Sequence, residues 1–403
     1  MSMPKVGRKT AHKLINEISY SLSDDRDLMD FLNEKGKLFK LPLFSQEDFD
    51  YAFRKTEAII TESEHLGIRM ISFKDDNYPC LLAKTTDLPI ILNYKGDISL
   101  LSEKPTVAII GTREPTDFGM KLGTRLSEVF ASNGFNIVSG LAVGCDTAGH
   151  RGALNVSGTT TAVLAHGLDK IYPKENRALA DQILEKGGVL VSEYFVKQTA
   201  LANFFIERDR IQAGLSLGTI VVETDVKGGT MHTVKFTLEN NRVLATLNHP
   251  SEYLKEPKTQ GNQLLIRERK ARPIYLKEEV DDLIISLKES FRARGSVSID
   301  TSVSPKADID ISVAISGTDL FSSLEPVKDE NSKDLHSKNE EEIASAELSS
   351  KTGKKSTSTL SESKAKGTNK DKSVKIAKEP KAEKAAPPSK KTPKNNNQSK
   401  LWD

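Results

Sequence analysis

The sequence predicts an α/β protein built on a doubly wound, mostly parallel sheet, with a small helical N-terminal domain and a disordered C-terminal tail. Short apolar runs rich in β-branched residues recur between residues 107 and 247, and the segments between them are long enough for helices. Residues 301–403 contain two aromatic side chains and are rich in Ser, Lys, Glu and Pro. The predicted domains are therefore residues 1–67, 68–290 and 291–403.

The sheet is predicted from the strand-like runs in the middle of the chain. Near-continuous apolar strands that alternate with helices indicate βαβ units and a parallel sheet buried on both faces. Right-handed crossovers then place helices on both faces of that sheet. The predicted helices include residues 118–133 and 176–186. The predicted strands are residues 107–111, 136–140, 161–165, 189–192, 219–223 and 243–247.

The N-terminal segment, residues 4–67, is predicted to be helical. Its large apolar residues recur at spacings that suit amphipathic helices. We expect such helices to form a small separate domain ahead of the sheet. The apolar residues that support this prediction are Leu28, Phe31, Leu32, Phe49, Phe53 and Ile60.

The tail is predicted from composition and charge. The 403-residue chain has a formal net charge of +2, but this charge is unevenly distributed. Residues 351–403 hold 15 lysines and five acidic residues, a net charge of +10, so the first 350 residues carry −8. Such a tail cannot bury enough apolar surface to fold, and repulsion among its lysines keeps it extended. Any binding of nucleic acid by the acidic folded part must rely on local arginines and helix N-termini.

Several classes of protein are excluded by composition. No run of about 18 apolar residues occurs, so no transmembrane helix and no membrane partner are expected. Residues 1–20 lack the apolar segment of a secretory signal. Two cysteines, Cys80 and Cys145, are too few for a disulfide framework and fit the reducing cytoplasm. The seven histidines have no metal-ligand spacing, so neither a metal nor a cofactor is expected.

Three glycine-containing turns follow predicted strands and precede predicted helices. Ligands of open α/β sheets bind at the carboxyl ends of the strands, where helix N-termini attract anions. Glycine allows close backbone approach, and Arg113 can bind a phosphate through two hydrogen bonds. A plain strand-to-helix turn with a surface arginine explains any single turn equally well. The candidate phosphate-binding residues here are Gly111, Thr112, Arg113, Ser139, Gly140, Gly228, Gly229 and Thr230.

A fourth candidate segment combines arginines with aromatic residues. Arg208 and Arg210 lie near the start of a predicted helix, close to Asn203 and two phenylalanines. Arginines beside aromatic rings are typical of surfaces that hold the backbone and stack the bases of single-stranded nucleic acids. The alternative is that the apolar residues belong to the core and the arginines to a solvated helix face.

The order of these motifs resembles the DNA-processing protein A (DprA/Smf) family over about residues 68–275. The matching motifs include Ala-Ile-Ile-Gly-Thr-Arg at 108–113, Ser-Gly-Leu-Ala at 139–142, His-Arg-Gly-Ala-Leu at 150–154 and Arg-Asp-Arg-Ile at 208–211. The resemblance implies an extended Rossmann-like fold, single-stranded DNA binding, loading of a RecA-type recombinase during DNA uptake or recombination, and a homodimer. The scattered histidines and lone cysteines offer no positioned acid, base or nucleophile, so no catalytic site is expected.

The resemblance assigns several residues to the DNA-binding pocket, and two of the departures from the family pattern alter the charge there. Gly111, Arg113, Ser139, Gly140, Arg151, Arg208 and Arg210 fall where the family lines this pocket. Val143 stands where the family usually has arginine, so one expected cation is missing. Asp209 replaces the usual asparagine and brings a negative charge towards the DNA.

An enzyme remains the alternative prediction. Gly228-Gly229-Thr230 followed by Glu239 loosely resembles the signature of phosphoribohydrolases, which cleave nucleotides on a related scaffold. In that signature the glutamate follows the threonine within a few residues, so the spacing here is wrong.

The last residues of the chain predict a contact with a protein partner. Gln398, Leu401 and Trp402 resemble the Gln-x-x-Leu-aromatic peptide with which bacterial replication and repair proteins bind the DNA sliding clamp. Exposed apolar side chains in a disordered tail gain free energy only when a pocket receives them. A chance match of five residues is the alternative. The lysines of the tail can in addition neutralise DNA phosphates.

Overall fold

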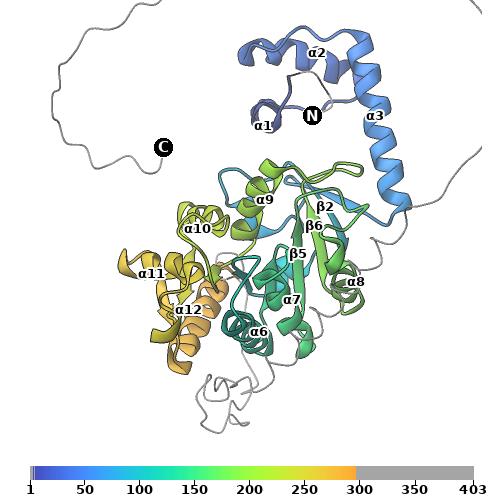
Figure 1. Cartoon of the computed structure of the whole chain (residues 1–403). Coiled ribbons are helices and arrows are strands. Elements are labelled where there is room, and N and C mark those ends of the chain that lie inside the picture. Colours follow the sequence, from blue (N-terminus) through green and yellow to red (C-terminus); the bar gives the residue numbers. More distant parts are fainter. Residues whose placement is uncertain (1–2, 4, 296–403) are drawn as a thin grey trace, which may run out of the picture. The chain divides into compact units, whose positions relative to one another are not determined.

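The computed structural model describes Met3 and residues 5–295, all of which belong to one unit, Met1–Pro326. Within this part of the chain, one nine-stranded sheet carries helices on both faces, which confirms the predicted fold class (Figure 1). The predicted tail and its peptide at 398–402 lie outside the described residues. No helix among the described residues is long and apolar enough to cross a membrane.

The sheet has the strand order β1-β2-β6-β5-β4-β3-β7-β8-β9. Strands β3 to β9 pair in parallel, whereas β1 pairs with β2, and β2 with β6, in antiparallel register. The bounds are β1 Arg69–Ser72, β2 Ile91–Gly96, β3 Thr106–Ile110, β4 Asn136–Ser139, β5 Thr160–Leu164, β6 Val189–Ser192, β7 Gly218–Val221, β8 Val243–Leu247 and β9 Arg272–Ile274. All six predicted strands are present, within one or two residues at each end.

The direction of winding reverses between β3 and β7. From β3 the chain adds β4, β5 and β6 on one side, and it then returns to add β7, β8 and β9 on the other. Ile110 pairs with Val221 at the carboxyl ends of these two strands. Loops that leave the sheet in opposite directions open a crevice at such a point, which is where open α/β sheets bind ligands.

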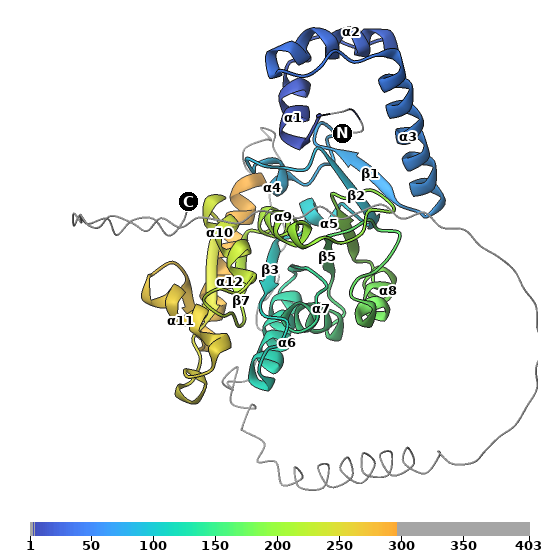
Figure 2. The ribbon, with the colours of Figure 1, turned by 45° about the horizontal axis from the view of Figure 1, so that its top comes forward.

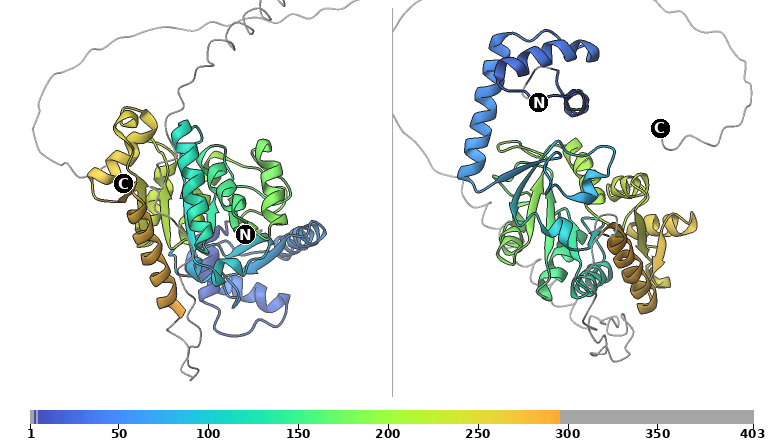
Figure 3. Two further views of the ribbon diagram at one scale, coloured as in Figure 1. Left: turned by 90° about the horizontal axis from the view of Figure 1, so that it is seen from below. Right: turned by 180° about the vertical axis from the view of Figure 1, so that it is seen from behind.

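The strands are buried on both faces, as their apolar runs predicted. Val107 and Ile109 of β3 belong to one core cluster, and Ala108 and Ile110 belong to another on the opposite face. Apolar residues of α6 (Asp117–Ser132), α7 (Cys145–Asn155), α8 (Arg177–Glu185) and α12 (Lys277–Gly295) cover the first face. Those of α9 (Ala202–Gly214), α10 (Thr230–Glu239) and α11 (Gln260–Arg267) cover the second (Figures 2 and 3). Two short helices, α4 (Cys80–Ala83) and α5 (Leu100–Glu103), precede β3.

The sequence analysis did not predict strands β1, β2 and β9. Strand β1 has one buried residue among its four, β9 has one among three, and β2 carries the polar run Asn-Tyr-Lys. None of them therefore shows the long apolar run by which buried parallel strands are detected. Together β1 and β2 extend the parallel sheet by an antiparallel edge.

The N-terminal segment is helical, as predicted. It contains α1 (Arg8–Asn16), α2 (Asp25–Lys35) and α3 (Gln46–His65), which form a group beside the sheet (Figure 1). Phe31 and Phe49 are buried, whereas Phe53 and Ile60 are 37% and 42% exposed and lie outside the core of these helices. The helices share their core with Ile90, which lies beyond the predicted boundary at residue 67.

Candidate functional site

A pocket of about 370 Å³ lies at the carboxyl edge of the sheet, where the winding reverses. Its walls come from the loops after β3, β4 and β7 and from the first turns of α9 and α10. It contains seven of the twelve predicted phosphate-binding residues: Gly111, Thr112, Arg113, Arg208, Gly228, Gly229 and Thr230. We refer to it as the switch-point pocket.

Arg208 fastens α9 to the floor of this pocket. Its side chain is buried, and its Nη1 donates hydrogen bonds to the carbonyl oxygens of Gly140 at 2.7 Å and Val163 at 2.6 Å. A side chain on Gly140 would overlap the guanidinium, so glycine is required there by the protein itself. Ser139 also acts within the protein, because its hydroxyl donates to the carbonyl oxygen of Ile109 at 2.7 Å. Ser139 and Gly140 therefore support the pocket from beneath.

The turn after β3 is held by Glu223, which follows β7. The backbone N–H of Thr112 donates to the carbonyl oxygen of Glu223 at 2.8 Å, and Thr116 donates its N–H and its hydroxyl to the Glu223 carboxylate. A Cβ on Gly111 would lie 2.5 Å from the Cys145 sulfur, so this glycine allows β3, α7 and β7 to meet. We expected the N–H groups of this turn to be free to bind a phosphate. Those of Thr112 and Thr116 instead donate to Glu223.

The loop between β4 and α7 is likewise held by a side chain of the protein. The Asp146 carboxylate, in the first turn of α7, accepts hydrogen bonds from the N–H groups of Gly140 at 3.1 Å and Ala142 at 3.3 Å. The N-terminus of α10 differs, because Gly228, Gly229 and Thr230 themselves line the pocket. The partial positive charge of this helix end therefore faces the pocket.

Two carboxyl groups and one guanidinium determine the charge of the pocket floor. The Asp209 carboxylate lies 3.2 Å from Arg208 Nε. Burial, together with the nearby Asp146, raises the pKa of Asp209 to about 7, against the opposing effect of Arg208. Burial also raises the pKa of Asp146. Near neutral pH the floor therefore carries less negative charge than its two carboxyl groups suggest.

A row of planar groups begins at the mouth of the pocket, where Arg113 is exposed and Phe205 is half-buried. The Arg113 guanidinium lies 5.1 Å from the ring centroid of Phe205, and that ring lies 6.0 Å from the ring of Tyr172. Arg113 is exposed, and Tyr172 is 50% exposed. Ile206 is 41% exposed beside them, so an apolar and cationic surface faces outward. Sequence analysis missed Tyr172 as a site residue because it lies some 30 residues from Phe205 in the chain.

The remaining predicted arginines and Asn203 do not line the pocket. Arg210 is buried on another side of α9, where it donates to the carbonyl oxygen of Asp87 at 2.6 Å and to the Glu193 carboxylate. Its assignment to the DNA-binding pocket is wrong, because two residues along a helix turn a side chain by about 200°. Arg151 is exposed on α7 and Asn203 is exposed at the start of α9, both outside the pocket lining.

The geometry does not favour the enzyme alternative. Glu239 ends α10, whereas Thr230 begins it, so the two lie roughly 13 Å apart along the helix. Glu239 is paired with Lys235 at the surface and does not line the pocket. Among the described residues, no group of three His, Cys, Asp or Glu side chains is placed to hold a metal ion.

Comparison with known proteins now identifies the family. A family model described as DNA recombination-mediator protein A matches residues 69–288, which is more than half of the chain. The chain belongs to this family. A Smf protein of Synechocystis is 38% identical over 191 residues, which covers 47% of this chain and 48% of the relative. A DNA processing protein DprA of Streptococcus pneumoniae is 40% identical over 171 residues, which covers 42% of this chain and 60% of the relative.

A solved structure of the recombination-mediator family supports the same assignment. The X-ray structure of DNA processing protein A from Streptococcus pneumoniae is similar to this chain with a TM-score of 0.53 and 29% identity. The similarity covers 69% of this chain and 98% of that one. The chain spans about half to three fifths of the length of the curated relatives above.

The raised pKa of Asp209 predicts how stability depends on pH. The unfolded chain ionises Asp209 near its ordinary pKa of 3.8, and the folded chain near 7. Between these values the folded state binds more protons, so its stability falls as pH rises, by at most about 1.4 kcal/mol per pH unit. In urea unfolding, the free energy of unfolding of Asp209→Asn relative to that of the wild type should rise from about pH 4 to about pH 7. Above about pH 7 this difference should stay constant. A gap that is independent of pH would contradict the raised pKa.

Proposed function

We propose that this chain binds single-stranded DNA in the switch-point pocket and does so without catalysis. Arg113 and the N-terminus of α10 would hold backbone phosphates, while Phe205 and Tyr172 would stack bases. Of the phosphate-binding residues predicted from the sequence, those that line the switch-point pocket would contact the DNA backbone. Arg208, Ser139 and Gly140 would shape the site from within.

The observation that carries this proposal is the row formed by Arg113, Phe205 and Tyr172. Partly exposed aromatic rings beside an arginine bind a flexible strand by stacking, worth about 1–3 kcal/mol per base. Bases inside a duplex are stacked on one another and cannot use such rings without being extruded. The geometry therefore supports a preference for single strands over duplexes.

The role in recombination is a proposal that membership of the family supports. The family is described as DNA recombination-mediator protein A. We propose that the chain, acting in the cytoplasm as a homodimer, loads a RecA-type recombinase onto the bound strand during DNA uptake or recombination. A mediator needs a strand held with its backbone fixed and part of it accessible, and a shallow pocket at a sheet edge suits that need.

The tail would add two contacts to this function. Its net charge of +10 can neutralise phosphates of the same strand, in a way that weakens with salt. Its last residues, with Gln398, Leu401 and Trp402, would bind the DNA sliding clamp. These contacts would bring recombinase, clamp and DNA to one place.

Replacing Arg113 tests the proposed function most simply. Because Arg113 supplies a phosphate contact and lies over Phe205, Arg113→Ala should weaken binding of a fluorescent single strand by roughly tenfold, measured by anisotropy at fixed salt. Arg125→Ala is the matched control, since Arg125 is an exposed arginine on α6 that pairs with Glu128 outside the pocket. Equal affinities for both variants, or equal binding of duplex and single strand, would refute the proposal.

The clamp contact is tested on the whole chain with two tail residues replaced. A Leu401→Ala, Trp402→Ala variant should no longer be retained on immobilised sliding clamp, because it lacks the apolar side chains that would fill a pocket of the clamp. Its affinity for single-stranded DNA should match the wild type, which serves as the folding control. Undiminished retention of the variant would exclude this peptide as the clamp-binding segment.

A further inference from the structure

The carboxyl group of Asp209 lies in the switch-point pocket beside the groups proposed to hold phosphates. Asp209 lines this pocket together with Arg113 and with Thr230 at the start of α10. Its side chain is 13% exposed, so solvent screens its charge only in part. An ionised carboxylate in this position repels a phosphate, whereas a protonated carboxyl group does not. The protonation of Asp209 therefore bears directly on the affinity of the pocket for an anionic strand.

Asp209 belongs to a buried cluster of two carboxyl groups and one guanidinium. Arg208 Nε donates to Asp209 Oδ1 at 3.2 Å. The Gln212 amide, oriented so that both of its ends are satisfied, donates to the same oxygen at 3.0 Å. Asp146 accepts from two N–H groups of the loop before α7, and these hydrogen bonds favour its ionised form. Two ionised carboxylates repel each other in such a cluster, so the proton of the pair falls to Asp209.

The charge of this cluster changes close to neutral pH. Burial and the nearby Asp146 raise the pKa of Asp209 to about 7, against the opposing effect of Arg208. A group with this pKa is mostly protonated at pH 6 and mostly ionised at pH 8. The switch-point pocket therefore gains most of one negative charge over this range, at a residue of its own lining.

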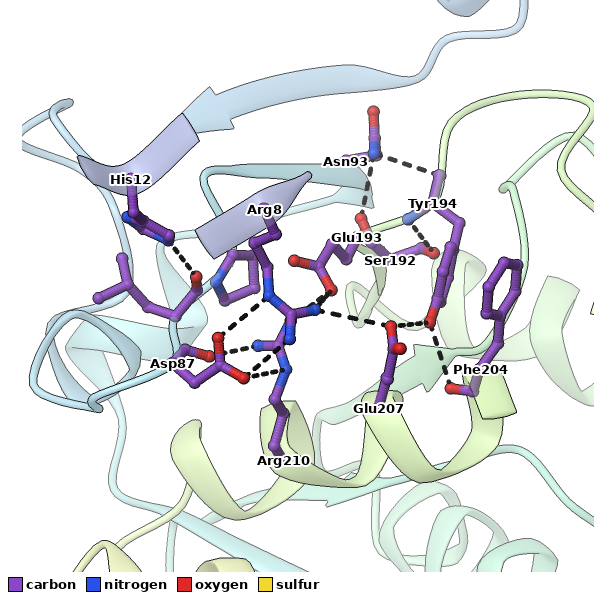
Figure 4. Close-up of polar contacts among 12 residues, drawn as sticks. Arg8, His12, Asp87, Asn93, Ser192, Glu193, Tyr194, Phe204, Glu207 and Arg210 are labelled. Carbon is purple, nitrogen blue, oxygen red and sulfur yellow. Dashed lines mark hydrogen bonds and ion pairs between the residues drawn. The ribbon is translucent and has the colours of Figure 1, made fainter. Parts of the chain in front are cut away.

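The other side of α9 is anchored by contacts that do not involve Asp209. Arg210 donates to the carbonyl oxygen of Asp87 at 2.6 Å and to the Glu193 carboxylate. Arg8 of α1 donates to the Asp87 carboxylate at 2.8 Å and to Glu193 at 3.2 Å (Figure 4). This ion-pair network holds α9 whether Asp209 is protonated or ionised. A change in the charge of Asp209 therefore acts on a ligand in the pocket and leaves the helix in place.

We propose that Asp209 couples the binding of single-stranded DNA to the uptake of a proton. A backbone phosphate in the switch-point pocket would favour the neutral carboxyl group, so binding would draw a proton from solvent onto Asp209. Affinity would then fall as pH rises through neutrality. The proton would sit on Oδ2, because Oδ1 already accepts from Arg208 and Gln212. This inference rests on the proposed function, since the strand held at Arg113 is what brings the phosphate.

Other charged and titratable groups share the pocket with Asp209. Histidine is the residue type that ordinarily titrates near neutral pH, and His232, exposed on α10, is the histidine of the lining. Its contribution therefore has to be separated from that of Asp209. Burial lowers the pKa of His150 to about 3 and also lowers that of His166, so these two histidines near Arg208 stay neutral. The charged or titratable groups of the lining are Arg113 and Glu114 after β3, Asp146 on α7, Arg208 and Asp209 on α9, Asp225 after β7 and His232 on α10.

The pH dependence of binding tests this coupling. The probe is a fluorescent oligothymidine without a terminal phosphate, because neither its bases nor its phosphodiesters titrate between pH 6 and pH 8. At fixed salt the wild type should bind this strand about five- to tenfold more weakly at pH 8 than at pH 6, since most of the Asp209 charge appears in between. Asp209→Asn should bind with nearly equal affinity at both pH values. Asparagine is similar in size and keeps an oxygen that accepts from Arg208, so this variant should fold.

Two other residues of the pocket provide matched controls. Asp225 is an exposed acid of the same lining, so Asp225→Asn removes a negative charge and leaves Asp209 in place. This variant should bind more tightly than the wild type at both pH values and keep the wild-type ratio between them. His232→Gln should also keep most of that ratio. A profile that is flattened by His232→Gln and unchanged by Asp209→Asn would show that His232 is the titrating group, and it would overturn the proposal.

Calorimetry measures the proton itself and separates this inference from the proposed function. Titrations at pH 7 in two buffers of different ionisation enthalpy should show an uptake of about half a proton per occupied pocket in the wild type, and almost none in Asp209→Asn. If Arg113→Ala weakens binding while the wild type binds equally at pH 6 and pH 8 and takes up no proton, the coupling is wrong and the proposed function stands. If the wild type binds no single strand at either pH, the proposed function fails and the coupling fails with it.

Discussion

The buried guanidinium of Arg208 is the interaction on which the arrangement of the carboxyl edge depends. It joins α9 to the backbone after β4 and within β5 through two short hydrogen bonds to carbonyl oxygens. A buried cation is stable only where hydrogen bonds and a counter-charge satisfy it. Gly140 leaves room for it, and the Asp209 carboxyl group lies 3.2 Å from its Nε. Once α9 is fixed in this way, Phe205, Arg208 and Asp209 line the switch-point pocket.

Charge in this region is local and partly self-compensated. Asp146 accepts hydrogen bonds from the loop before α7, and Glu223 holds the turn after β3, so the protein uses for its own structure some of the N–H groups that could bind an anion. The groups left for a ligand are the exposed Arg113, the end of α10 and the aromatic rings beside them. Binding by a few placed groups, rather than by net charge, is what an acidic folded part requires.

Sequence analysis could find the sheet and the position of the site but not the direction of its side chains. Six buried strands show in the sequence as apolar runs, and the turns after β3 and β7 show as glycine motifs. Arg208 and Arg210 look equivalent in the sequence, yet one lies under the pocket and the other joins Glu193. The contacts of Arg8 with Asp87 and Glu193 join residues 79 and 185 positions apart, and no local pattern encodes such a pairing.

Mapping where single-stranded DNA touches the chain tests the central claim most directly. Ultraviolet cross-linking of the full-length protein to a single strand, followed by mass spectrometry of the adducts, reports the aromatic residues in contact with bases. Our account predicts adducts at Phe205 and Tyr172, which are lost when unlabelled single strand competes and persist when duplex competes. Adducts confined to residues 296–403, with none around the switch-point pocket, would contradict it.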